Sequence, residues 1–186
     1  MIDFIFELGQ LKRVKRSGWW LAHVDNPESV ADHSFRAAMI AYLLAMEEGV
    51  NPEKAAVICL LQDIPETRLN DLHKIGHRYI DFRRAEAKVF KEQMDTLPKP
   101  IADRLTPLFS GYHQDGSKEG IVARDADLLE CAVQAKEYIE HGHPECQEWI
   151  DNTEKLLHTS TAKKILKELR NTASNQWSKG LKKIQR

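Results

Sequence analysis

The sequence lacks a large excess of charge of either sign, and it lacks any long apolar run. Its 186 residues include 27 Lys and Arg against 28 Asp and Glu, for a net charge of -1 with His neutral. Proteins that coat polyanions normally carry a large basic excess, so this balance argues against general nucleic-acid binding. No stretch approaches the roughly 20 apolar residues of a membrane span. We therefore expect neither nucleic-acid nor membrane partners.

Cysteine is also scarce, and the first residues do not have the composition of a secretory leader. Cys59, Cys131 and Cys146 form no CxxC pair and no even disulfide framework. The first ten residues carry Asp3 and Glu7 and no basic segment, which argues against a signal peptide. A reducing, cytoplasmic location is the simplest interpretation.

Helical periodicity is what the sequence does contain. Hydrophobic residues make up 42% of the chain, which is enough burial to offset chain entropy, and they recur at three- and four-residue spacing almost throughout. Ser29 with Asp32 three positions later is typical of a capping box. The pair Asn51-Pro52 is a further helix start signal, and Pro65 ends the helix that follows.

These signals predict a single all-α domain over residues 1–186, built as a bundle of six to eight helices. Its core is expected at about 2–142, with C-terminal helices at about 145–177. The predicted helices are 2 to about 14, 29–49, 52 to about 63, 77–95, 99–110, 118–141, 145–157 and 161–177. The helix 52–63 is apolar nearly all round, so it is expected in the centre of the bundle.

Five ionisable residues fall at apolar positions of these helices or close to their ends. They are His33, Asp63, Glu66, Asp71 and Asp127. Carboxylates in apolar surroundings are costly unless they are paired, protonated or bound to a metal. A histidine and several carboxylates that converge in one bundle core have the composition of a transition-metal hydrolase site.

Each of these residues also has a simpler explanation when it is taken alone. His33 could be a hydrogen-bonded structural residue, and Asp63 could face water in the last turn of its helix. Asp127 could form an ion pair with Arg124 or be solvated. The order and the sequence context of the residues favour the site over these alternatives.

Three segments in order carry a resemblance to a known family: ESVADHS at residues 28–34, LLQDIPE at 60–66 and RDAD at 124–127. The chain resembles the HD-domain metal-dependent phosphohydrolase superfamily, and within it the small 5'-deoxynucleotidase group with its archaeal and eukaryotic relatives. LNDLHKI at 69–75 also looks like the segment after the HD pair in those relatives. The likeness runs from residues 8–13 to 134–138 and implies an HD-domain helical bundle.

The resemblance implies one divalent transition metal ion, such as Mn, Co, Fe, Ni or Zn, held by a His…His-Asp…Asp pattern. His33 matches the first ligand and Asp63 the Asp of the HD pair. Asp127 matches the last ligand better than Asp125, which is then a neighbour. Gln62 stands where the family has its second His. Gln62 could still reach the ion through its carbonyl oxygen or support a water that does, but a neutral amide oxygen is a poor ligand for such ions, so affinity and the preference for softer metals should fall.

The resemblance further implies hydrolysis of a phosphomonoester by a metal-activated water. Glu66 is placed to manage protons, because its position beside an apolar helix end could raise its pKa; the alternative is a surface ion pair with Arg68. Asp71 matches a family position that orients water or substrate. Lys74 could contact phosphate, although a surface lysine is an equal alternative.

The basic and aromatic segment 12–20 is a candidate for recognition of the nucleotide. The family relatives use an Arg-Trp pair here, and Arg16 and Trp19 are the predicted substrate-binding residues, with Arg13 in reserve. Arg suits phosphate through bidentate contacts, and a Trp can stack on a base. The alternative is a solvated basic turn with Trp residues in the core, and this is the expectation for Trp20.

Two functions therefore compete. The first is a phosphoric monoester hydrolase, a 5'-deoxynucleotidase that acts on (deoxy)nucleoside 5'-monophosphates. The second is a metal-weakened or inactive HD-fold protein that binds nucleotides, because Gln62 replaces the family His. A structural helical module is a third option, and it requires the candidate ligands to face solvent. The resemblance also raises a homodimer, whose interface or core could use Ile165, Leu169 and Trp177.

Overall fold

The architecture was analysed in a computed structural model that describes residues 1–113, 116–179 and 181. The described residues form nine α-helices and five short 3-10 helices, η1–η5. Their one β-type pairing is an isolated antiparallel bridge between Lys15 and Ser29. The prediction of an all-α chain is confirmed.

The α-helices are, in chain order, α1 (Ile2–Leu8), α2 (Val30–Glu48), α3 (Pro52–Leu61), α4 (Glu66–Leu69), α5 (Phe82–Asp95), α6 (Lys99–His113), α7 (Lys118–Glu140), α8 (Gln147–Leu156) and α9 (Ser160–Asn171). The 3-10 helices are η1 (Gly9–Lys12), η2 (Ser17–Ala22), η3 (Gly76–Arg78), η4 (Pro144–Cys146) and η5 (Gln176–Ser178). None of the helices in this described part combines the length and the apolar character that crossing a membrane requires.

The helix count exceeds the predicted six to eight because of α4, a single turn directly after Pro65. Three predicted helices are also shorter than expected. The first ends at Leu8 and continues as a 3-10 turn, and the last ends at Asn171 before a separate 3-10 turn. The predicted helix 77–95 begins only at Phe82, because the Asp81 side chain caps it.

Local capping sets the ends of α2 and α3. Ser29 Oγ accepts from the Asp32 backbone N–H at 3.2 Å, and the Asp32 carboxylate accepts from the Ser29 N–H at 2.9 Å. Helix α2 ends at Gly49, whose φ of 66° is a left-handed conformation that suits glycine. Asn51 Oδ1 then accepts from the Lys54 N–H at 2.8 Å to start α3. The two helices are therefore joined by a very short loop.

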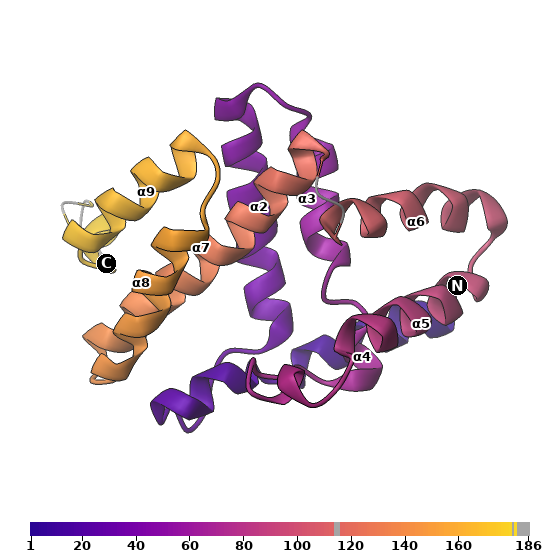
Figure 1. Ribbon diagram of the computed structural model, residues 1–186, viewed down its shortest axis with the longest axis horizontal. Coiled ribbons are helices and arrows are strands. Elements are labelled where there is room, and N and C mark those ends of the chain that lie inside the picture. Colours follow the sequence, from indigo (N-terminus) through magenta and orange to yellow (C-terminus); the bar gives the residue numbers. More distant parts are fainter. Residues whose placement is uncertain (114–115, 180, 182–186) are drawn as a thin grey trace, which may run out of the picture.

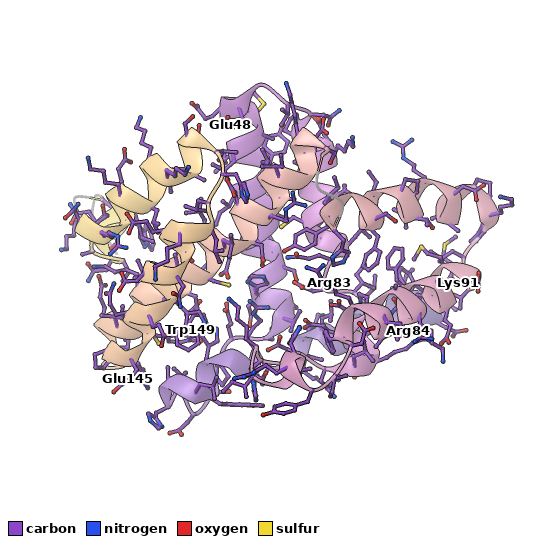
Figure 2. The ribbon with its side chains drawn as sticks, viewed as in Figure 1. Glu48, Arg83, Arg84, Lys91, Glu145 and Trp149 are labelled. Atoms are coloured by element: carbon purple, nitrogen blue, oxygen red, sulfur yellow. The ribbon has the colours of Figure 1, made fainter. Side chains whose placement is uncertain are left out.

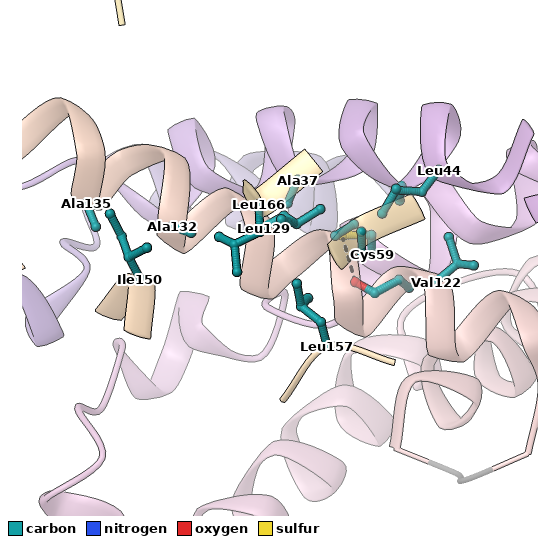
Figure 3. Packing of buried hydrophobic residues seen from close by; sticks show 14 of the residues in the cluster. Ala37, Leu44, Cys59, Val122, Leu129, Ala132, Ala135, Ile150, Leu157 and Leu166 are labelled. Carbon is teal, nitrogen blue, oxygen red and sulfur yellow. Dashed lines mark hydrogen bonds between the residues drawn. The ribbon is translucent and has the colours of Figure 1, made fainter. Parts of the chain in front are cut away.

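Helix α2 lies in the middle of the molecule and packs against both α3 and α7 (Figure 1). Helices α8 and α9 cover α7 on the other side, and Trp149 of α8, labelled in Figure 2, packs against the resulting core. Figure 3 shows this core, to which α2, α3, α7, α8 and α9 all contribute buried side chains. Helix α3 contacts α2, α6 and α7, in agreement with its predicted central place.

A second hydrophobic cluster holds α1, α5 and α6 together. Phe90 of α5 stacks on Phe109 of α6 with ring centroids 3.9 Å apart, and Phe4 of α1 joins them. The end of α3 belongs to both clusters, since Cys59 lies in the first and Leu61 in the second. The residues that follow α3 therefore sit where the two clusters meet.

Candidate metal centre and active site

His33 lies in the first turns of α2 and is completely buried. Its Nδ1 forms a hydrogen bond with Glu130 Oε2. Its Nε2 faces Asp127 Oδ1 at 2.9 Å and Asp63 Oδ2 at 3.6 Å. Segments that are almost a hundred residues apart in sequence thus meet at one imidazole. The structure brings together the three residues that match the family's metal ligands.

The two carboxylates of this centre have different surroundings. Asp63 accepts a hydrogen bond from Ser34 Oγ at 3.1 Å, and burial raises its pKa against the opposing charge of His33. Asp127 accepts from the Tyr112 hydroxyl at 2.8 Å. Burial alone would raise the pKa of Asp127, but the hydrogen bond and charge of His33 outweigh it and lower the pKa to about 2. Two carboxylates beside one imidazole fit a divalent cation by the chemistry of their donor atoms.

Gln62 is buried next to this centre, 4% exposed. Its Nε2 donates to Asp127 Oδ1 at 3.2 Å. The amide therefore presents an N–H to the cluster, where the family's histidine would present a nitrogen lone pair.

Glu66 begins α4 and is also buried, with 5% exposure. Its Oε2 has no hydrogen-bond partner among the described residues. Burial, and then the charges of Asp63 and Asp71, raise the pKa of Glu66 well above its usual range. The alternative of a surface ion pair with Arg68 is wrong, because Arg68 binds Glu7 instead, at 2.7 Å. A buried carboxyl with a raised pKa beside other titratable groups is typical of a proton carrier.

Arg16 and Asp71 form one unit at the edge of the centre. The Ser17 backbone N–H donates to Asp71 Oδ2, and Arg16 Nη1 lies 3.9 Å from Asp71 Oδ1. Arg16 Nη2 donates to Cys131 Sγ at 3.1 Å. The Arg16 charge also acts on the carboxylates of Asp63 and Asp127, whereas Arg13 is exposed. The structure thus brings Arg16, and not the reserve candidate, to the site.

The two tryptophans have exchanged the places expected of them. Trp20, expected in the core, is 53% exposed, so that expectation is wrong. Trp19 is only 2% exposed, with Tyr138 and Trp149 rings 5.1 and 5.0 Å away. Its Nε1 donates to Glu28 Oε1 at 3.0 Å, and this partly buried acceptor explains why Trp19 is the inner residue. The structure does not present the Trp19 ring to solvent.

Two charged residues of α5 lie on the side of the centre nearest α6. Burial and the charge of Asp63 raise the pKa of Glu86 to about 7. Arg83 extends from α5 toward the central helices in Figure 2, and its charge acts on both Glu86 and His113. Lys74, the other predicted phosphate contact, is exposed in the segment after Asp71.

Sequence reasoning missed Glu130 and Cys131. Glu130 is fully buried and accepts from Arg36 Nε at 2.8 Å as well as from His33. The helical positions i+3 and i+4 from Asp127 are on the same helix face, so the spacing could have identified both.

Asp125, the alternative to Asp127, faces a different part of the molecule. It is fully buried and accepts from the His158 N–H at 3.0 Å and the Thr159 N–H at 2.7 Å. It therefore anchors the connection between α8 and α9, and only Asp127 of the two lies at His33.

Comparison with known proteins gives one family and several close relatives. The HD domain family matches residues 8–170. The human 5'-deoxynucleotidase HDDC2 is 30% identical over 156 residues, which is 82% of this chain and 76% of that protein. The Danio rerio 5'-deoxynucleotidase HDDC2 is 31% identical over 172 residues, covering 91% and 86%.

Solved structures agree with these sequence matches. A conserved hypothetical protein from Pyrococcus furiosus is 36% identical, with a TM-score of 0.78, over 92% of this chain and 100% of that chain. A protein from Pyrococcus horikoshii is 30% identical, with a TM-score of 0.78, over 92% and 99%. Both the sequence and the arrangement of helices are therefore shared along nearly the whole length.

Proposed function

Because this chain belongs to the HD-domain family, we propose that it is a divalent-cation-dependent phosphohydrolase that releases phosphate from deoxynucleoside 5'-monophosphates. One observation carries the proposal: His33 Nε2 lies 2.9 Å from an Asp127 oxygen and 3.6 Å from an Asp63 oxygen. The substrate class is supported by the curated relatives named 5'-deoxynucleotidase, at about 30% identity.

His33, Asp63 and Asp127 would hold the cation, with Gln62 beside them. When bound, a divalent cation supplies Lewis-acid activation of the attacking water and of the phosphoryl group.

Glu66 would supply the proton that the reaction needs. Hydrolysis joins a water oxygen to phosphorus and breaks the bond to the nucleoside 5'-oxygen, which must then gain a proton. Burial and the charges of Asp63 and Asp71 raise the pKa of Glu66, which favours the protonated carboxyl, and its Oε2 is not engaged by another described residue. The Glu66 carboxyl is therefore suited to donate that proton to the leaving oxygen.

Arg16 would bind the phosphate, since its guanidinium reaches the centre and suits phosphoryl oxygens. Asp71 would orient Arg16 and the substrate by fixing the turn at Ser17. Buried Trp19 would position this turn, because it lies in η2 and joins it to the hydrophobic core. Lys74, exposed beyond Asp71, would contact the nucleotide from outside.

A panel of 5'-ribonucleotides and 5'-deoxynucleotides assayed with Mn²⁺, Co²⁺, Mg²⁺ and Zn²⁺ tests this function. We expect phosphate release that prefers deoxynucleotides and that falls by about 10²–10⁴-fold in Glu66→Gln. If no pairing of nucleotide and metal releases phosphate, and the Gln62→His variant is also silent, the proposal fails.

A second candidate function is favoured by Gln62, whose amide offers an N–H to the centre. In this alternative the protein binds a nucleotide without efficient turnover. Gln62→His should then raise metal content and rate sharply while nucleotide affinity stays nearly unchanged. Equal rates for the two proteins would count against this alternative.

We also propose a homodimer formed through one exposed face of α2, which we call the α2 stripe: Phe35, Met39, Leu43 and Met46. Their exposed fractions are 71%, 49%, 59% and 60%. They lie at helical spacing on one face, and a two-fold axis would bury such a stripe against its own copy. The residues predicted earlier near the C-terminus fit this role less well, since Ile165 and Leu169 pack on the chain's own core.

Sedimentation of the purified chain tests the dimer. We expect a dimer that dissociates in Leu43→Glu, while Trp177→Glu, at a 77% exposed tryptophan elsewhere, leaves it intact. A monomeric parent protein, or a dimer that survives Leu43→Glu, would contradict the proposed face.

A reducing compartment such as the cytoplasm is proposed for this protein on the basis of its cysteines. Cys59, Cys131 and Cys146 are all free thiols, and two of them are buried in the core. Labelling of the thiols in extracts prepared under acid quench would show all three reduced; an oxidised fraction would contradict this location.

A further inference from the structure

Cys131 lies at the candidate metal centre without having any place in the family's ligand pattern. It follows Asp127 by four residues on α7, so the two side chains leave the same helix face one turn apart. Two ligands at i and i+4 on a helix is a spacing that metal sites use. One donor atom each from His33, Asp127 and Cys131 lie within 4.8 Å of one another.

The thiol has a polar environment that the other cysteines lack. Arg16 Nη2 donates to Cys131 Sγ at 3.1 Å. Burial raises the pKa of this thiol to about 12 although the Arg16 charge acts in the opposite direction, so the bound cation itself must displace the thiol proton. Cys59 and Cys146 are instead fully buried members of the hydrophobic core.

The centre is also one donor short of the family pattern. Gln62 directs its Nε2 at Asp127, so the atom that it turns toward this carboxylate is a hydrogen-bond donor, where the family pattern has an imidazole nitrogen. Zinc-like cations take four ligands in structural sites and at least three protein ligands in catalytic sites. A sulfur donor on the neighbouring helix face is available to replace the missing nitrogen.

We propose that Cys131 Sγ binds the divalent cation as a thiolate together with His33 and Asp127, with Asp63 as the remaining carboxylate of the centre. On binding, a sulfur–metal bond forms and the thiol proton passes to solvent. The inference rests on the cation site of the proposed function. Its consequence is a preference for thiophilic cations such as Co²⁺, Zn²⁺ and Cd²⁺ over Mg²⁺ and Mn²⁺.

Titration of the metal-depleted full chain with Co²⁺ under reducing conditions tests the proposal. We expect a near-ultraviolet thiolate-to-cobalt charge-transfer band that saturates at one equivalent. Cys131→Ser should abolish the band, while the matched variant Cys146→Ala should keep it, because Cys146 lies in the core on η4. Circular dichroism checks that both variants are folded.

A second measurement, calorimetry with Cd²⁺ and Mn²⁺, gives a result that does not depend on spectra. Cys131→Ser should weaken Cd²⁺ binding by about tenfold or more and Mn²⁺ binding by less than about threefold. Equal losses for the two ions would overturn the proposal.

The outcomes separate this inference from the proposed function. Stoichiometric Co²⁺ with visible bands but no charge-transfer band overturns the role of Cys131 and leaves the cation site standing. A band that persists in Cys131→Ser also overturns it. No Co²⁺ binding by the parent protein overturns both the inference and the cation-dependent function.

Discussion

Removal of Glu130 should be the most destabilising single change near the candidate centre. The side chain is fully buried and binds both the Arg36 guanidinium and the His33 imidazole. Its Oε1 accepts from Arg36 Nε at 2.8 Å, Arg36 Nη2 lies 2.8 Å from the same oxygen, and Oε2 binds His33 Nδ1. Glu130→Ala would leave a buried His33 and a partly buried Arg36 without their shared carboxylate.

The expected cost follows from this burial. Removing one partner of a buried ion pair costs about 3–5 kcal/mol, because the remaining charge is uncompensated. Glu130→Gln keeps the shape and one acceptor oxygen, so its cost should be about 1.5–3 kcal/mol. Glu137 is the matched control: it binds the same Arg36 at 2.8 Å, but its side chain is 33% exposed. Glu137→Ala should cost about 0.2–1 kcal/mol.

Urea unfolding followed by circular dichroism measures these differences. The expected order of destabilisation is Glu130→Ala, then Glu130→Gln, then Glu137→Ala. A second readout is cation affinity, which should fall by about 10–100-fold in Glu130→Gln because Glu130 fixes the His33 ring. If Glu130→Ala and Glu137→Ala shift the free energy of unfolding equally, the argument from burial is refuted.

Three further changes probe other parts of the fold. Burial, and then the charge of Glu130, raise the pKa of Glu28 to about 7, so its stabilising contribution is complete below about pH 4 and is lost as pH rises through 7. Between pH 5 and 8 the free energy of unfolding of the parent protein should fall by about 1–3 kcal/mol more than that of Glu28→Gln, as measured by urea unfolding at each pH. If the free energy of unfolding depends on pH equally in the two proteins, this reasoning is wrong. Asp125→Ala should lower the free energy of unfolding by about 2–4 kcal/mol, because it removes the acceptor of two backbone N–H groups. It should also speed amide hydrogen exchange in α9, and unchanged exchange rates there would contradict the anchoring role of Asp125. Gly120→Ala should lower thermal stability by about 1–3 kcal/mol, since its Cβ would lie 2.2 Å from the Gly111 carbonyl oxygen, whereas Gly9→Ala, with nothing within 4 Å, should not.

The helix starts were predictable wherever the signal is local. The capping box at Ser29 and the Asn51-Pro52 pair each involve residues within four positions, so the sequence contains the whole interaction. The errors arise where apolar periodicity continues through a change of backbone conformation. Asp81 caps α5 inside a predicted helix, and α4 is a single turn too short to produce a period.

The candidate site likewise has features that local sequence predicts and contacts that only tertiary packing creates. His33 and Asp127 could be recognised from their segments, and the face they share with Glu130 and Cys131 could be computed from helical spacing. The contact between Arg16 and Cys131 could not, because it joins positions 115 residues apart through tertiary packing.

The choice between Trp19 and Trp20 shows most directly what local sequence could not predict. The two residues are adjacent in η2, with the same side chain, so composition and period treat them alike. Burial of Trp19 depends on the acceptor at Glu28 and on the aromatic rings of α7 and α8. Those partners come from three separate segments.

Helix α7 carries two different tasks on opposite sides within three residues. Asp125 holds the connection to α9, and Asp127 contacts His33. Each residue of an α-helix turns the chain by about 100°. One residue inserted or deleted near position 126 would rotate one aspartate out of its task relative to the other. Insertions or deletions between the two aspartates should therefore be poorly tolerated, because α7 sets the positions of both the candidate metal centre and the connection between α8 and α9.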